Sequence, residues 1–437
     1  MKAHRFVRRI DETEFARSYG YVRKVAAGLV EASGPAAPLG ELCEIESPGG
    51  RRSVLAEVAA VEEKRVVLIP LEEHGAIVPD ARVRSRPMRD RVPVGDAFAG
   101  RAVDALGRPI DGRGAIAADA FVPLRGEVPK PMDRSNPSRV LATGLRAIDG
   151  LLTLGEGQRV GIFAASGVGK TSLMEQLAEQ IESDRTILCL VGERGREVEA
   201  ISRQLGKRPD AQRFTIVAAT SDESAALRAR AASYALCLAD HWRARGEHVL
   251  LMVDSVTRLA MALREIGLAA GAPPTVRAYT PNVFAALPRL VERCGATRSA
   301  GAITAIITVL SETDDVDDPI VELMKSLLDG HIVLSRTLAE QGHFPAIDVA
   351  RSVSRGAERL VSREQVEAMR GVVAMLTAYE ESRVMIESGV YKSGTNAVVD
   401  RAIAARPAIN AFLRQERCDK ARIDQSVRTL QGLAGHA

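Results

Sequence analysis

Residues 162–173 read IFAASGVGKTSL, and this stretch decides how the rest of the chain is interpreted. Two glycines, Gly167 and Gly169, stand just before a Lys-Thr pair. Small residues let successive backbone N–H groups approach the oxygens of a phosphate, and the dipole of a following helix favours the same anion. The strict pattern begins with a glycine where this chain has Ala164, but a methyl group is tolerated at a strand end if φ is negative. The stretch therefore predicts a phosphate-binding loop.

The flanking sequence supplies the strand and the helix that such a loop needs. RVGIFA, residues 159–164, is a short apolar run, and TSLMEQLAEQI, residues 171–181, places Leu173, Leu177 and Ile181 on one helical face. A strand-to-helix turn without a ligand is the alternative, and the Lys-Thr pair in register favours nucleotide binding over it. The predicted ATP-binding residues are Ala165, Ser166, Gly167, Val168, Gly169, Lys170, Thr171 and Ser172.

Catalysis at such a loop requires a metal ion and a carboxylate in addition to the loop itself. Lys170 is expected to pair with the β and γ phosphates of ATP, and the Thr171 hydroxyl to bind Mg²⁺. HVLLMVDS, residues 248–255, places Asp254 at the end of a buried strand, where a second metal ligand is needed. An Asp after an apolar strand is often a helix N-cap, but its pairing with the loop favours the metal role.

The segment VGERGREVE, residues 191–199, provides the groups that could orient an attacking water. Glu193 and Arg194 follow the apolar run TILCLV, so in a parallel sheet they lie at the edge where ligands bind. A cluster of surface charges explains the segment equally well from local sequence. The two interpretations stay open on these residues alone.

Further from the loop, the pattern predicts three parts. Short β-rich pieces from Tyr19 to Met88 predict a small closed β-barrel, and the glycine-punctuated segment 93–114 predicts a connector. Continuous apolar runs such as FTIVAA and AITAIITVL predict a mainly parallel α/β sheet. A Ser362/Gln365 capping box, followed by Val366, Met369, Val373 and Leu376, predicts C-terminal helices. The predicted domains are 1–18 (a helix or tail), 19–92 (barrel), 93–355 (phosphate-loop domain) and 356–437 (helical).

Composition narrows the class of protein. A formal charge of +3 over 437 residues and 4% aromatic residues argue against a general nucleic-acid surface. Five scattered cysteines without a CxxC pair favour single thiols in a reducing cytoplasm over zinc or disulfides. There is no signal-peptide core and no apolar run near the roughly 20 residues that span a bilayer. We expect a cytoplasmic protein with, at most, peripheral membrane contact.

Several longer strings carry a resemblance to a known family. They include GLRAIDGLL (144–152), LVGERGREV (190–198), DSVTRLAMALREIGLAAG (254–271) and LLDGHIVLSRTLAEQGHFPAIDV (327–349), together with ASGVGKTS, PNVFAALPRLVER and SVSR. From about residue 90 to 355 the chain resembles the flagellar and type III secretion ATPases, relatives of the catalytic beta subunit of ATP synthase. The resemblance implies a RecA-like ATPase domain between the barrel and the helices.

The resemblance also implies roles for individual residues. Glu193 is expected to be the catalytic carboxylate, with Arg194 near the γ-phosphate and Asp254 holding the metal through water. Arg355, at the end of SVSR, matches the arginine that this superfamily inserts into a neighbouring subunit's site, where it neutralises charge on the transferred group. From local sequence alone Arg355 would be a solvated helix-end residue.

The implied partners are those of an export ATPase. They are a homohexamer, a stator-like regulator at the N-terminus, a central stalk protein, an export gate, chaperones and secreted cargo, at the inner face of the bacterial inner membrane. No nucleic acid is expected. Two departures from the family pattern are Ala165, where glycine is usual, and Ala272, where glutamate is usual. Flagellar and virulence branches share these strings.

Two other functions are weighed against this one. A non-catalytic nucleotide-binding ring subunit would lack the carboxylate at Glu193. A hexameric RNA translocase should carry basic and aromatic residues on its barrel, and Tyr19 and Tyr21 are the only aromatic rings of this kind in residues 19–88. Both features favour an ATPase that exports protein.

Overall fold

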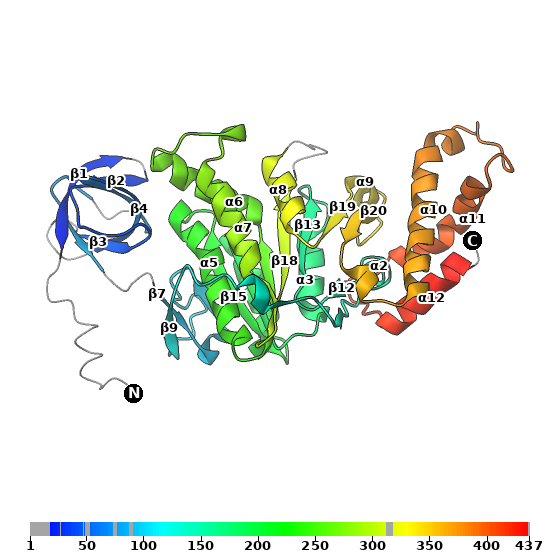
Figure 1. The fold of residues 1–437 in the computed structure, drawn as a ribbon, viewed down its shortest axis with the longest axis horizontal. Coiled ribbons are helices and arrows are strands. Elements are labelled where there is room, and N and C mark those ends of the chain that lie inside the picture. The colour runs from blue at the N-terminus through cyan, green and yellow to red at the C-terminus, as the bar shows by residue number, and fades with distance from the viewer. Residues whose placement is uncertain are drawn as a thin grey trace.

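The chain forms a barrel, a sheet-centred core and a helical part, which follow one another along the long axis of the molecule (Figure 1). The computed structural model describes residues 18–26, 28–46, 48, 53–72, 77–86, 91–311 and 318–435. The predicted N-terminal helix or tail, residues 1–18, lies outside the described residues except for Ser18. None of the helices formed by the described residues has the length and apolar character to cross a membrane.

The barrel predicted from the β-rich pieces is confirmed. Its strands close in the order β1-β2-β5-β4-β3-β6, and every neighbouring pair is antiparallel. The bounds are β1 (Tyr19–Ala26), β2 (Leu29–Ala32), β3 (Leu42–Glu46), β4 (Ser53–Glu62), β5 (Arg65–Pro70) and β6 (Arg82–Ser85). Alternate residues such as Val22, Val30, Ile45 and Val83 fill the interior, as closure of a small barrel requires. The sequence had not indicated β6.

The central sheet has ten strands in the described part of the chain and is mainly parallel, as predicted. Its main path runs β20-β19-β13-β18-β16-β14-β15-β8, and β19 and β20 are antiparallel to each other. The bounds are β8 (Ala102–Asp104), β13 (Arg159–Ala164), β14 (Arg185–Glu193), β15 (Phe214–Thr220), β16 (His248–Asp254), β18 (Ala302–Leu310), β19 (Gly330–Leu334) and β20 (Ile347–Ser354), with β10 (Arg134–Ser135) and β17 (Gly295–Thr297) off this path.

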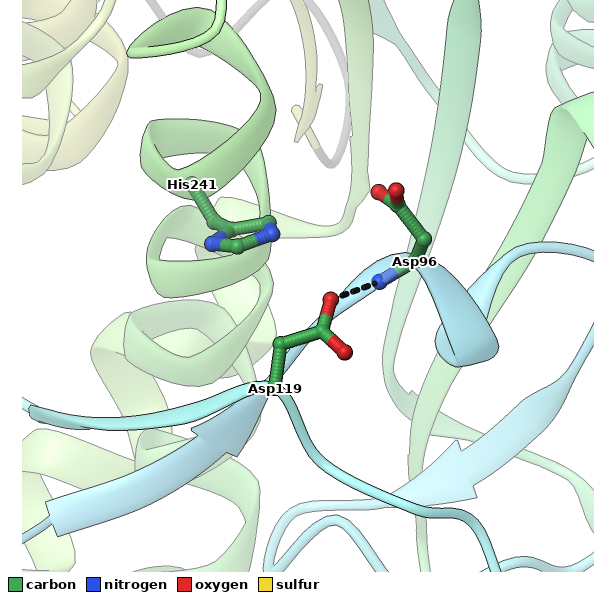
Figure 2. A group of neighbouring side chains, drawn as sticks. All are labelled: Asp96, Asp119 and His241. Atoms are coloured by element: carbon green, nitrogen blue, oxygen red, sulfur yellow. Dashed lines mark hydrogen bonds between the residues drawn. The ribbon is translucent and has the colours of Figure 1, made fainter.

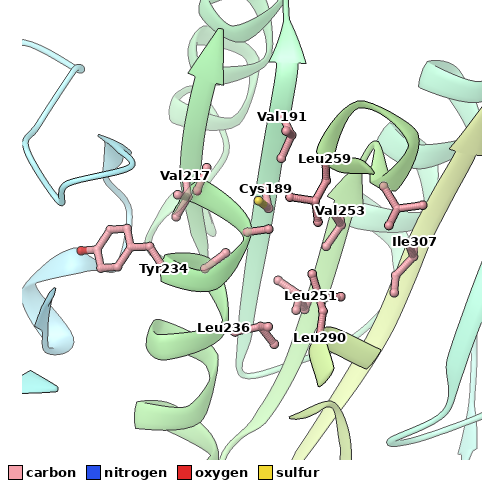
Figure 3. Packing of buried hydrophobic residues seen from close by; sticks show 14 of the residues in the cluster. Cys189, Val191, Val217, Tyr234, Leu236, Leu251, Val253, Leu259, Leu290 and Ile307 are labelled. Atoms are coloured by element: carbon pink, nitrogen blue, oxygen red, sulfur yellow. The ribbon is translucent and has the colours of Figure 1, made fainter. Parts of the chain in front are cut away.

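Both faces of this sheet are buried, which is why its strands are continuous apolar runs. On one face Cys189, Val191, Leu251, Val253 and Ile307 pack against side chains of three helices (Figure 3). These helices are α5 (Ala225–Arg243), α6 (Val256–Ala269) and α7 (Pro281–Arg293). Successive residues of a strand point to opposite faces, so the intervening side chains of β14 and β16 join a second cluster with α3 (Lys170–Gln180) and α4 (Gly195–Gly206).

The C-terminal helices are α10 (Arg363–Glu387), α11 (Ala397–Leu413) and α12 (Ile423–Gly435). Ser362 caps α10, because its Oγ accepts a hydrogen bond from the Gln365 backbone N–H at 3.3 Å. The reciprocal half of the predicted capping box is absent from the contacts described for this helix start. Gln365 Nε2 instead donates to backbone carbonyls of α2 (Arg146–Leu151), at 3.4 Å from Asp149 O.

Two other details differ from the sequence-based predictions. Of the predicted α10 stripe, Leu376 is buried and Met369 and Val373 are half-buried against the same cluster, whereas Ala368, Val372 and Met375 are also buried and were not predicted. The segment 93–114, predicted to be a connector without strand character, contains β8, which extends the central sheet beside β15. Three residues are too few to show a period-2 pattern, so this strand carried no sequence signal.

Candidate functional site

The loop between β13 and α3 has the geometry of an anion-binding turn. Gly167 and Gly169 have φ values of 82° and 93°, a region that side-chain-bearing residues adopt only with strain, so both positions require glycine. Helix α3 begins at Lys170, and among the described residues no side chain caps its N-terminus. The first N–H groups of the helix are therefore left for a ligand at the positive end of its dipole.

Lys170 and Asp254 form an ion pair at the end of the central strands. Lys170 Nζ contacts Asp254 Oδ1, and the two side chains are largely buried. Thr308 Oγ1, on β18, donates to the same Asp254 oxygen at 2.8 Å. The three side chains come together because β18 lies between β13 and β16 and these parallel strands all end at the same edge of the sheet. Sequence reasoning placed Asp254 near the loop as a metal ligand but missed Thr308, a polar residue near the end of an otherwise apolar run.

Asp254 is not the N-cap of the helix that follows it. Ser255 occupies that position, and its side chain accepts from the Arg258 backbone N–H at 3.4 Å. The structure therefore rules out the capping role that local sequence suggested for Asp254. Its carboxylate points into the site, against Lys170 and Thr308, where a cation ligand would be needed.

Glu193 ends β14 and lies in the same group of charges. Burial raises its pKa from the ordinary value of 4.5 to about 7, and repulsion from Asp254 and a hydrogen bond with Glu197 act in the same direction. Lys170 and Arg258 oppose that shift. A carboxyl whose pKa lies near neutral can exchange a proton at physiological pH, which suits a general base.

Arg258, which sequence reasoning did not assign, holds the strand end that carries Glu193. Its Nη2 lies 3.5 Å from Glu193 Oε2, and its Nη1 donates to the Gly192 carbonyl. Gly192 has a φ of 70°, and the register between β14 and β15 shifts there. A Cβ at Gly192 would lie 3.0 Å from Arg258 Cδ, so the turn and the guanidinium fit only with glycine. An arginine in the first turn after Asp254 was the sequence signal for this contact.

The structure does not bring the other two predicted residues into this group. Arg194 is exposed and forms the N-cap position of α4, next to Glu193 but on the solvent side. Arg355 follows β20, whose last residue Ser354 pairs with Gly330 at the start of β19. Gly330 in turn pairs with Val160 at the start of β13. Arg355 therefore lies at the opposite edge of the sheet from the loop, and six strand residues at about 3.3 Å each put roughly 20 Å between them.

A cavity of about 470 Å³ opens beside the loop, and sequence reasoning missed it. Its lining includes Val168, Gly169, Phe344, Arg414 and Gln415. The Gln415 backbone N–H donates to the Phe344 carbonyl at 2.9 Å, which joins the segment after α11 to the one before β20. These segments are far apart in sequence, so no local pattern could have revealed the cavity.

A separate group of possible metal ligands, Asp96, Asp119 and His241, lies beside α5 (Figure 2). Arg245 Nη1 is 2.9 Å from Asp96 Oδ1, 3.2 Å from His241 Nε2 and 3.9 Å from Asp119 Oδ2. This guanidinium contacts all three groups and offsets part of the charge of the two carboxylates. The group is therefore a salt-bridge network that links Asp96 to the C-terminal end of α5.

Three family models match the chain. The nucleotide-binding domain of the ATP synthase alpha/beta family matches residues 144–354, and the beta-barrel domain of that family matches residues 22–86. The T3SS EscN ATPase C-terminal domain matches residues 361–432. The three matches cover the sheet core, the barrel and the C-terminal helices in turn.

Curated relatives and solved structures agree with these matches. The flagellum-specific ATP synthase of Bacillus subtilis is 42% identical, with 100% of both chains covered. The type 3 secretion system ATPase of Xanthomonas euvesicatoria is 44% identical over 91% of this chain and 90% of that protein. The assembled ATPase EscN from the enteropathogenic Escherichia coli type III secretion system has a TM-score of 0.90 at 37% identity, over 95% of this chain and 100% of EscN. EscN in complex with its central stalk EscO has a TM-score of 0.85 at 36% identity, with the same coverage.

The raised pKa of Glu193 predicts a pH-dependent stability difference. The folded protein holds this proton more tightly than the unfolded chain does, so stability falls as pH rises from 4.5 through about 7. Glu193→Gln lacks the effect, and its stability advantage should grow across that window to on the order of 1–3 kcal/mol. Thermal unfolding of both proteins from pH 5 to 8, without nucleotide, measures it. Glu199→Gln, at an exposed carboxylate on α4, is the control, and an unfolding difference that does not change with pH would contradict the prediction.

Proposed function

The chain belongs to the family of flagellum-specific ATP synthases and type 3 secretion system ATPases, and we propose that it hydrolyses Mg²⁺-bound ATP at sites shared between copies. It is an ATPase that energises protein export by a type III apparatus. The observation that carries the proposed site is the meeting of the loop, the Lys170–Asp254 pair and Glu193 at one edge of the sheet. Each of these residues has a distinct task in phosphoryl transfer.

The loop binds the triphosphate. The N–H groups of residues 165–172 face the phosphate oxygens, and Lys170 pairs with the terminal phosphates. The Thr171 hydroxyl and the Asp254 carboxylate provide oxygen donors, which fit Mg²⁺, and Thr308 keeps the carboxylate oriented. When bound, the metal neutralises charge on the phosphates. Lys170, which contacts Asp254 in the structure, would turn N–H donors of its ammonium toward the phosphates when they bind.

Glu193 orients the attacking water and accepts its proton. Its pKa of about 7 leaves a useful fraction ionised at neutral pH and makes the carboxylate a stronger base than an exposed glutamate. Arg258 restrains the Glu193 carboxylate from the side of α6. Arg194, on the solvent side of Glu193, is positioned to approach the γ-phosphate when the site closes.

The cavity beside the loop holds the nucleoside. It adjoins Gly169, the residue before the phosphate-binding lysine, and Phe344 offers a flat ring for stacking a base. Arg414 and Gln415 add polar groups at the cavity wall. This arrangement places the base on the side of the loop that faces the C-terminal helices.

Arg355 completes the site of a neighbouring copy. It cannot serve its own loop, because the length of the sheet separates them, whereas a second copy could bring its loop against this edge. The relative EscN is described as an assembled ATPase. We propose a homohexameric ring in which each copy gives Arg355 to the next.

The export partners follow from the same assembly. EscN forms a complex with a central stalk, so a stalk protein is proposed for this chain as well. Val384, Met385, Val390 and Val398 are exposed around the connection between α10 and α11, at the far end of the helical part (Figure 1). This apolar tip supports docking of chaperone-bound cargo near an export gate. A stator-like regulator would bind residues 1–18, and the ring would work at the inner face of the inner membrane.

Glu193→Gln should retain ATP binding and lose turnover by at least about 100-fold, because the amide cannot accept the proton of water. Binding of a fluorescent ATP analogue and steady-state phosphate release measure the two effects separately. Glu199→Gln should behave as wild type in both assays. Near-normal phosphate release by Glu193→Gln would remove this residue from the mechanism, and a wild-type protein without turnover would point to a non-catalytic ring subunit.

Arg355→Ala should lower turnover about 10³-fold without weakening ATP binding to the isolated chain, because the Arg355 side chain acts on the nucleotide of a neighbouring copy. The check is to mix Arg355→Ala with Glu193→Gln copies, which still offer Arg355. Mixed rings should recover part of the activity. If Arg355→Ala alone kept full, concentration-dependent activity, Arg355 would not act in the site of a neighbouring copy.

A further inference from the structure

A second arginine, Arg359, lies beside Arg355 at the same edge of the sheet. The chain leaves β20 at Ser354 and forms a short 3-10 turn, Ala357–Arg359, directly after Arg355. Both arginines line one cavity of about 310 Å³, together with Arg134, Arg159 and Asp329. The cavity therefore gathers four guanidinium groups at the edge that faces away from the loop of its own copy.

Two of these guanidinium groups are already neutralised. Arg159 lies 2.9 Å from both Asp329 Oδ1 and Glu292 Oε1, and Arg134 lies 2.8 Å from Glu292 Oε2. Asp329, the acidic residue in the cavity lining, and Glu292 next to it are thus both engaged by the two inner arginines. The two outer arginines are left with their positive charge.

The outer pair has almost no contacts of its own. Arg355 Nη2 donates to the Lys325 carbonyl at 3.1 Å, which leaves its charge uncompensated. The Arg359 side chain has no hydrogen-bond or ion-pair partner among the described residues. Its sequence neighbour Glu358 is held elsewhere, at 2.7 Å from Arg370 on α10. Glu358 is thus engaged by α10 and does not neutralise Arg359.

The backbone that carries the two arginines is firmly anchored. The Arg355 N–H donates to the Asp329 carbonyl at 2.9 Å, and the Ser354 hydroxyl donates to the Thr153 carbonyl at 2.8 Å. Ala357 is buried, and the Leu360 N–H closes the turn on the Ala357 carbonyl at 2.9 Å. Two like charges on a fixed scaffold repel each other, so an anion from outside the chain would stabilise them.

We infer that Arg359 is a second cation that each copy presents, with Arg355, to the ATP phosphates held by the next copy. This rests on the proposed trans site, which would bring the triphosphate, Glu193 and Asp254 of the neighbour against this edge. A guanidinium can donate two parallel hydrogen bonds to phosphate oxygens, and this geometry suits two arginines that share one triphosphate. Arg359 thus strengthens the contact between copies most when the neighbour is loaded with ATP.

The first test measures ATPase activity against protein concentration. Arg359→Ala should raise the concentration for half-maximal activity by about five- to tenfold, and Arg359→Glu should raise it further, because reversal of the charge repels the phosphates. Arg359→Lys, which keeps the charge but loses the paired guanidinium donors, should lie between wild type and Arg359→Ala. Arg363→Ala is the matched control, since that exposed arginine pairs with Glu367 on its own helix. Equal effects of Ala, Glu and Lys would indicate a structural role and overturn the inference.

The second test asks whether Arg359 acts across the interface. Arg359→Ala copies are mixed with Glu193→Gln copies, which cannot turn over but still offer Arg359. Activity per Arg359→Ala copy should rise toward the wild-type value, and an unchanged value would overturn the inference. The same mixture made with Arg355→Ala copies separates the role of Arg359 from the proposed trans site of Arg355. Rescue there without any effect of Arg359→Ala leaves the proposed function intact and removes only Arg359, whereas no rescue there removes the trans site itself.

Discussion

The parallel alignment of four neighbouring strands is the constraint on which the site depends. β13, β18, β16 and β14 lie side by side in that order and all end at one edge. Their ends carry the phosphate loop, Thr308, Asp254 and Glu193. Because the side-chain period of a strand is two, a slip of one residue would turn Asp254 or Glu193 to the other face. The apolar packing on both faces fixes this register and thereby fixes the chemistry.

Two carboxylates and two cations lie together at this edge of the sheet. Asp254 and Glu193 are two buried carboxylates, and Lys170 compensates Asp254 directly. Lys170 and Arg258 both lower the pKa of Glu193, but burial and repulsion from Asp254 outweigh them. The raised pKa of Glu193 therefore arises first from burial, and the neighbouring Asp254 carboxylate adds to it. On the proposed mechanism a bound triphosphate also attracts the Lys170 ammonium, and a metal ion would help to balance Asp254 and the phosphates.

The sequence predicted the parts of this arrangement that are encoded locally. The apolar runs gave β13, β14, β16 and β18, and the residues after them gave Lys170, Asp254 and Glu193 as neighbours, because parallel strands share an edge. Thr308 and Arg258 were missed because their place in the site depends on the order of the strands, which no local sequence pattern indicates. The cavity at Phe344 and Gln415 joins distant segments, and only tertiary packing brings them together. The roles assigned to Arg194 and Arg355 came from the resemblance and remain predictions.

The position of Arg355 depends on a reversal of strand direction that the sequence did not reveal. β20 runs antiparallel to β19, so its end lies at the start of β13 and the arginines emerge opposite the loop. Two copies that join through these surfaces use different edges, which makes the contact heterologous. In an open row of copies, the copy at one end has a phosphate loop without a neighbour's arginines, and the copy at the other end has arginines without a neighbour's loop. A closed ring would satisfy every loop and every arginine edge at once, and under the proposed trans site the state of each nucleotide would depend on two adjacent copies.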